Sequence, residues 1–62
     1  MKELRNKTKE TLKNGKWLTS VSYYDRTVTV VSNGYECSSL DRFDQEFTTE
    51  NLDVAIDYLY PN

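Results

Sequence analysis

The sequence predicts a small α+β domain in which a three-stranded antiparallel β-meander packs against a C-terminal α-helix, with a second helix favoured at the N-terminus. Residues 17–40 hold three short runs rich in β-branched and aromatic residues, and turn residues separate these runs. Residues 50–60 carry apolar side chains at helical spacing. A chain of 62 residues has room for one core, so residues 1–62 are expected to form a single small domain.

The N-terminal segment, residues 2–13, supports two interpretations. A Glu-Lys pair at i, i+4 and the following Asn14-Gly15 favour a helix that ends before a glycine. The segment has few apolar residues, and residues 8–13 could instead pair with residues 16–21 across the same dipeptide as a β-hairpin. The balance slightly favours the helix.

Three predicted strands follow, at residues 17–24, 27–32 and 35–40. Turns are expected at residues 25–26 and 33–34. Alternation along a strand assigns the core side chains. The residues expected inside are Trp17, Thr19, Val21, Tyr23, Val28 and Val30, with Tyr35, Cys37 or Leu40 from the third strand.

The C-terminal segment carries the clearest signal for a helix, over about residues 50–60. Thr49 is a suitable N-cap, and acidic residues in the first turn suit the helix dipole. Pro61 prevents continuation of the helix. One apolar stripe, expected to lie across a face of the sheet, is formed by Leu52, Ala55, Ile56 and Leu59.

Charge is distributed unevenly along the chain, although the net charge is only −2. Residues 1–31 carry seven basic and three acidic side chains, whereas residues 32–62 carry one basic and seven acidic side chains. Such asymmetry indicates a basic arm, an acidic face, or two halves that attract one another.

The composition argues against catalysis and against a bound cofactor or metal ion. The chain contains no histidine, the commonest acid–base group near neutral pH, and no glycine-rich phosphate loop. Cys37 is the only cysteine, so it has no internal disulfide partner and is expected to be a buried thiol. No apolar run suggests a secretory signal or a membrane span, so we expect a cytoplasmic protein.

Aromatic residues make up 13% of the chain, a large share for so small a core. Neighbouring tyrosines such as Tyr23 and Tyr24 point to opposite faces of a strand, so some aromatic surface must be exposed or buried between chains. Tyrosine is common at protein interfaces. We therefore expect a homodimer, with Tyr24 and Tyr60 exposed to partners.

The acidic C-terminal half, residues 32–62, predicts a surface that binds a basic region of a partner protein. Its candidate partner-binding carboxylates are Asp41, Asp44, Glu46, Glu50, Asp53 and Asp57. The alternative is a single-stranded nucleic-acid binder, which would use the N-terminal lysines and Trp17. An antitoxin is a further alternative.

In size, acidity and lack of catalytic motifs, the whole chain resembles the small accessory proteins that bacteriophages encode. That resemblance rests on no specific motif, and it carries over no site residues. Many proteins of that kind bind and block a host defence or nucleic-acid-handling protein. The resemblance therefore implies a non-catalytic inhibitor that acts in the host cytoplasm on a host protein.

Overall fold

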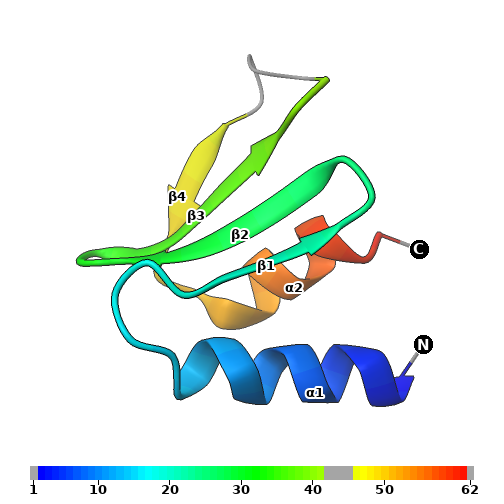
Figure 1. The fold of residues 1–62 in the computed structure, drawn as a ribbon, viewed down its shortest axis with the longest axis horizontal. Coiled ribbons are helices and arrows are strands. Elements are labelled where there is room, and N and C mark those ends of the chain that lie inside the picture. The colour runs from blue at the N-terminus through cyan, green and yellow to red at the C-terminus, as the bar shows by residue number, and fades with distance from the viewer. Residues whose placement is uncertain (1, 42–45, 62) are drawn as a thin grey trace.

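The chain forms an α+β fold with two helices and one four-stranded antiparallel sheet (Figure 1). The computed structural model describes residues 2–41 and 46–61. In chain order the elements are α1 (Lys2–Lys13), β1 (Ser20–Tyr23), β2 (Arg26–Val31), β3 (Gly34–Ser39), β4 (Phe47–Thr49) and α2 (Leu52–Leu59). The strands lie side by side in the order β1-β2-β3-β4, so the predicted meander is present and is one strand longer than expected.

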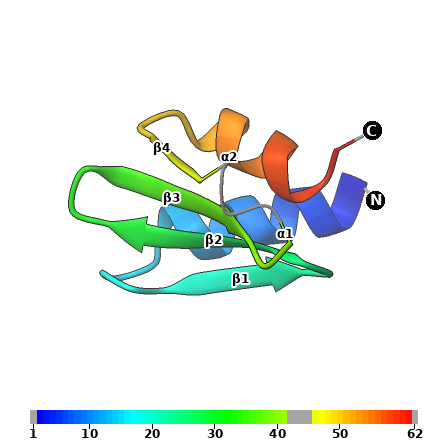
Figure 2. The same ribbon diagram turned by 90° about the horizontal axis from the view of Figure 1, so that it is seen from above.

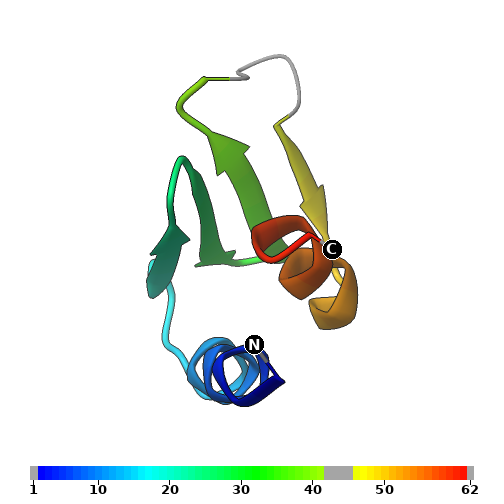
Figure 3. The same ribbon diagram turned by 90° about the vertical axis from the view of Figure 1, so that its right-hand side faces the viewer.

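Both helices contribute to a single core on one face of the sheet (Figures 2 and 3). Helix α2 contacts β2, β3 and β4, while α1 packs beside α2 and towards β1. The start of α1 and the end of α2 lie at the same end of the molecule. The buried core consists of Leu12, Val28, Cys37, Ala55, Ile56, Leu59 and Tyr60.

Helix α2 confirms the apolar stripe but begins later than predicted. The predicted N-cap, Thr49, is instead the last residue of β4 and pairs with Tyr35. Asn51 caps the helix, because its side-chain oxygen accepts a hydrogen bond of 2.9 Å from the backbone N–H of Asp53. Only the predicted cap, Thr49, belongs to the strand, and residues 50–51 lie between the strand and the helix.

Helix α1 resolves the ambiguity at the N-terminus in favour of the helix. Its side chains are mostly exposed, and only Thr8 and Leu12 are buried. The helix ends at Lys13, where the backbone N–H of Asn14 donates to the carbonyl of Glu10 at 3.0 Å. With so narrow an apolar face, α1 depends on polar contacts with α2 as well as on burial.

The first strand is shorter than predicted, and Trp17 lies outside the core with 68% of its surface exposed. Leu18 has a φ of +70°, and its backbone N–H donates to the carbonyl of Val30. The backbone N–H of Val30 in turn donates to the carbonyl of Thr19. Two residues opposite one form a β-bulge, with Leu18 at the position that glycine usually occupies. The bulge interrupts the side-chain alternation, so only Val21 and Tyr23 of the predicted inward face pack against the core.

The third strand ends before Leu40, which is exposed rather than packed in the core. The unpredicted β4 pairs antiparallel with β3 through only three residues. At the other end of β3, Gly34 has a φ of +139°, and a side chain there would meet the carbonyl of Thr49. Glycine at this position therefore allows the strand ends to approach closely enough for β4 to pair.

We predict that the stability of the fold falls at high pH because of Cys37. The thiol is fully buried, and burial, followed by the negative charge of Glu36, raises its pKa from 9.0 to about 11. A raised pKa means that the native state holds the proton more tightly. The free energy of unfolding should therefore decrease as pH rises from 9.0 to about 11, by at most about 1.4 kcal/mol per pH unit.

Denaturant titrations of the wild type and Cys37→Ala between these pH values would measure this contribution. The variant has a lower starting stability but lacks the thiol, so the difference between the two free energies should shrink as pH rises. Parallel pH profiles would contradict the assignment.

Candidate functional site

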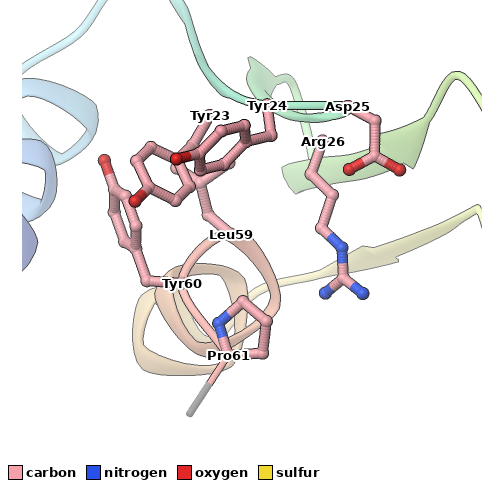
Figure 4. A pocket seen from close by; sticks show the side chains of 7 residues that line it. All are labelled: Tyr23, Tyr24, Asp25, Arg26, Leu59, Tyr60 and Pro61. Atoms are coloured by element: carbon pink, nitrogen blue, oxygen red, sulfur yellow. The ribbon is translucent and has the colours of Figure 1, made fainter.

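An open pocket of about 380 Å³ lies where the β1–β2 hairpin meets the end of α2 (Figure 4). The short hairpin and the end of the helix supply all of its walls. Pockets that bind small molecules or side chains are commonly about 300–1,000 Å³. Seven residues line this pocket, which we call the tyrosine pocket: Tyr23, Tyr24, Asp25, Arg26, Leu59, Tyr60 and Pro61.

Tyr60 forms the inner wall of the tyrosine pocket and is only 3% exposed, so the prediction that it is an exposed tyrosine is wrong. Its hydroxyl shares a 2.7 Å hydrogen bond with the Thr8 hydroxyl, and its carbonyl accepts one of 2.9 Å from the Arg5 guanidinium. Its ring meets that of Tyr23 edge to face, with centroids 4.7 Å apart. These contacts with α1 and β1 explain why a residue after the last turn of α2 is buried.

Tyr24 stands on the rim of the tyrosine pocket and is 87% exposed, as predicted. It is the first central residue of a two-residue hairpin loop that is closed by the pair Tyr23–Arg26. Its φ is +56°, a conformation that glycine or asparagine adopts readily and that costs other residues about 1–2 kcal/mol. The strained position therefore displays a large aromatic ring where stability alone would favour a small residue.

The Tyr24 ring packs edge to face against the neighbouring Tyr23 ring, at a centroid distance of 4.6 Å. Burial, followed by the Tyr24 phenol, raises the pKa of Tyr23 above its ordinary value. The Tyr23 phenol is therefore a neutral hydrogen-bonding group near neutral pH.

Arg26 brings a positive charge to the tyrosine pocket. Its Nη1 donates a 2.6 Å hydrogen bond to the carbonyl of Tyr58, and its guanidinium carbon lies 4.7 Å from the centre of the Tyr58 ring. Figure 4 shows the side chain extending from the hairpin towards the end of α2, while the Asp25 carboxylate lies on the side of Arg26 that faces away from the tyrosine rings. That carboxylate accepts a 3.1 Å hydrogen bond from the hydroxyl of Ser39, which ties the hairpin tip to β3.

Asp53 and Asp57 do not form a free acidic row, because both make ion pairs with α1. Asp57 pairs with Arg5, and Asp53 lies 2.6 Å from the ammonium nitrogen of Lys9. Exposed pairs of this kind contribute about 0–1 kcal/mol each. Of the three interpretations of the charge asymmetry, attraction between the two halves is the one that these ion pairs support.

The remaining acidic candidates are not among the residues that line the tyrosine pocket. Glu50 precedes α2, whereas Asp41 and Glu46 flank the segment 42–45; all three are exposed. Asp44 lies outside the described residues. Among residues 2–41 and 46–61, these three carboxylates make no ion pair, so their charge is open to solvent.

Reasoning from sequence missed most of the tyrosine pocket, including Tyr23, Arg26, Leu59 and Pro61. The turn was expected at residues 25–26, whereas the central residues are 24–25. A tyrosine in a two-residue loop was the available signal, since glycine and asparagine are the usual residues there. The contribution of α2 required knowledge of how the helix end meets the hairpin.

Within the described part of the chain, no group of three or more His, Cys, Asp or Glu residues is placed to hold a metal ion. The same residues include no helix that is long and apolar enough to cross a membrane. No protein-family model, curated protein or solved structure matches the chain.

We predict that Leu18→Asn stabilises the fold, because Leu18 has a φ of +70°, which is unfavourable for leucine, and its side chain is 56% exposed. Asparagine tolerates this conformation, so the free energy of unfolding should rise by about 0.5–1 kcal/mol. Leu18→Val should lower it, since a β-branched side chain fits positive φ least well. Denaturant titration measures both effects, and a less stable Asn variant would contradict the strain argument.

Proposed function

We propose that the chain is a non-catalytic protein-binding module that uses the tyrosine pocket to hold an apolar side chain of its partner. The observation that carries this proposal is Tyr24, a large aromatic residue that is exposed at positive φ on the rim of a pocket. Tyrosine and arginine are enriched among the residues that dominate binding energy at protein interfaces. Tyr23, Tyr24 and Arg26 would be such residues here.

The chemistry of Cys37 favours binding over catalysis. A nucleophilic thiol needs exposure and a lowered pKa, whereas Cys37 is buried and its pKa is raised to about 11. The phenols and the guanidinium of the pocket can donate hydrogen bonds, and the carboxylate of Asp25, which also lines the pocket, accepts a hydrogen bond from Ser39. The pocket is therefore suited to hold a group rather than to transform it.

The acidic side chains would have a secondary role in this proposal. Asp41, Glu46 and Glu50 are exposed and carry charge that no described cation neutralises. Charges outside the centre of an interface mainly speed association and select partners of opposite charge. We therefore propose a partner with a basic surface, in keeping with an inhibitor of a host defence or nucleic-acid-handling protein.

The nucleic-acid alternative loses part of its basis. Arg5 and Lys9, two of the basic residues in the N-terminal segment, are paired with carboxylates of α2. Lys7, Lys13 and Lys16 remain exposed, and so does Trp17. A test of function must therefore be able to detect nucleic acid as well as protein.

The test is a tagged pull-down from bacterial lysate, with nuclease-treated and untreated halves read by mass spectrometry. Three forms are compared: the wild type, Tyr24→Asn and Val54→Ala. Asparagine keeps the turn conformation and removes the ring, while Val54 is an exposed apolar residue of α2 outside the pocket. We expect a stoichiometric protein that survives nuclease and is captured by the wild type and Val54→Ala.

With that protein purified, Tyr24→Asn should weaken binding about tenfold or more, as loss of a central interface residue does. Equal affinity of Tyr24→Asn and the wild type would contradict the role of the pocket. Capture that disappears after nuclease treatment would favour nucleic-acid binding instead.

A further inference from the structure

Strand β1 is an edge strand whose outward backbone groups are unused. Val21 pairs with Val28, and Tyr23 pairs with Arg26 to close the hairpin. Hydrogen-bonded pairs alternate along antiparallel strands, so the N–H and C=O groups of Ser20 and Ser22 point away from β2. No backbone hydrogen bond from elsewhere in residues 2–41 and 46–61 reaches them.

This edge lacks the features that usually prevent two sheets from pairing. Protected edges carry lysine, proline or an inward-pointing charge, whereas β1 reads Ser-Val-Ser-Tyr. The bulge that could disturb pairing precedes Ser20 and leaves the four strand residues in register with β2. The edge is therefore a suitable template for another strand.

Exposed apolar side chains mark both ends of the same edge. Trp17 and Leu18 lie two to three residues before β1, and Tyr24 lies immediately after it. The two non-glycine residues with positive φ in the described chain are Leu18 and Tyr24, so each end displays a large side chain from a strained turn. A partner that covers the edge would also cover these side chains.

We propose that two copies of the chain pair β1 against β1, antiparallel, about a twofold axis at Val21. Ser20 then lies opposite Ser22 of the partner subunit, and each donates and accepts a backbone hydrogen bond. The same register brings Leu18 level with Tyr24 of the partner subunit. Because the axis repeats every contact, both strained apolar residues of each copy are covered by the other copy.

The available area fits a weak to moderate dimer. An aromatic side chain buries about 150–250 Å², so Trp17 and Tyr24, at 68% and 87% exposure, offer roughly 300 Å² per copy. Specific interfaces need about 1,000 Å² in total, and Leu18 with the strand edges supplies the remainder. Association should therefore depend on concentration.

The dimer goes beyond the proposed function and does not depend on it, but it covers Tyr24, so the second copy and the partner protein would compete for that side chain. It would place Leu18 of the partner subunit on the rim of the tyrosine pocket, whose other walls belong to one copy. A monomer with the same pocket could still bind a partner protein. The two proposals therefore need different variants, and those below leave Tyr24 in place.

Sedimentation velocity of the full chain over a wide concentration range tests the dimer. The wild type should shift from monomer to dimer as concentration rises. The double variant Ser20→Lys/Ser22→Lys places lysines opposite lysines and should stay monomeric. The control, Thr48→Lys, puts one lysine on the exposed side of β4 at the other edge and should still dimerise.

A second pair of variants with the opposite charge distinguishes loss of the dimer from loss of the fold. Ser20→Glu/Ser22→Glu should also be monomeric alone, but an equimolar mixture with the lysine variant should form heterodimers, because opposite charges then face each other. Circular dichroism confirms that each variant is folded. A wild type that stays monomeric, lysine variants that dimerise as the wild type does, or loss of the dimer in Thr48→Lys would each overturn the proposal.

Discussion

The buried hydroxyl of Tyr60 is the contact on which the arrangement of the helices depends. It meets the hydroxyl of Thr8 at 2.7 Å in the interior, and the same residue accepts a hydrogen bond from Arg5 and packs against the ring of Tyr23. One residue therefore joins α1, the end of α2 and the β1–β2 hairpin. Two buried hydroxyls that satisfy each other stabilise only modestly, but leaving either one alone is costly.

This contact matters because α1 has little else to hold it. Its buried side chains are Thr8 and Leu12, and its ion pairs through Arg5 and Lys9 are exposed to solvent. The polar contacts therefore select where the helix lies, while Leu12 supplies most of its apolar burial. By fixing Tyr60, they also shape the inner wall of the tyrosine pocket, so the stability of α1 and the form of the candidate site are linked.

Patterns that repeat along the chain were enough to predict the regular elements. The apolar stripe of Ala55, Ile56 and Leu59 predicted α2, and the alternation of Val28 with polar neighbours predicted β2. Features that depend on a distant partner were not predictable in this way. Strand β4 has three residues and exists because β3 pairs with it, and Trp17 leaves the core because a bulge at Leu18 shifts the alternation.

In the candidate site, too, features set by neighbouring residues were predictable and features set by distant residues were not. The exposure of Tyr24 followed from its place beside Tyr23 near a turn, whereas the burial of Tyr60 followed from a hydroxyl partner 52 residues away. The ion pairs of Asp53 and Asp57 likewise join residues that are far apart in sequence. The sequence therefore indicated tyrosines and carboxylates as candidate binding residues, whereas tertiary contacts determine which of these side chains are exposed and which are buried or paired.

The most direct test of the role of Tyr60 is a double-mutant cycle with Thr8→Ala, Tyr60→Phe and the double variant, measured as free energies of unfolding. Each single variant leaves one buried hydroxyl without its partner, and the double variant removes both. The two effects should therefore be non-additive, with a coupling energy of about 1 kcal/mol or more. Additivity within about 0.3 kcal/mol would show that the two hydroxyls act independently and would contradict the account.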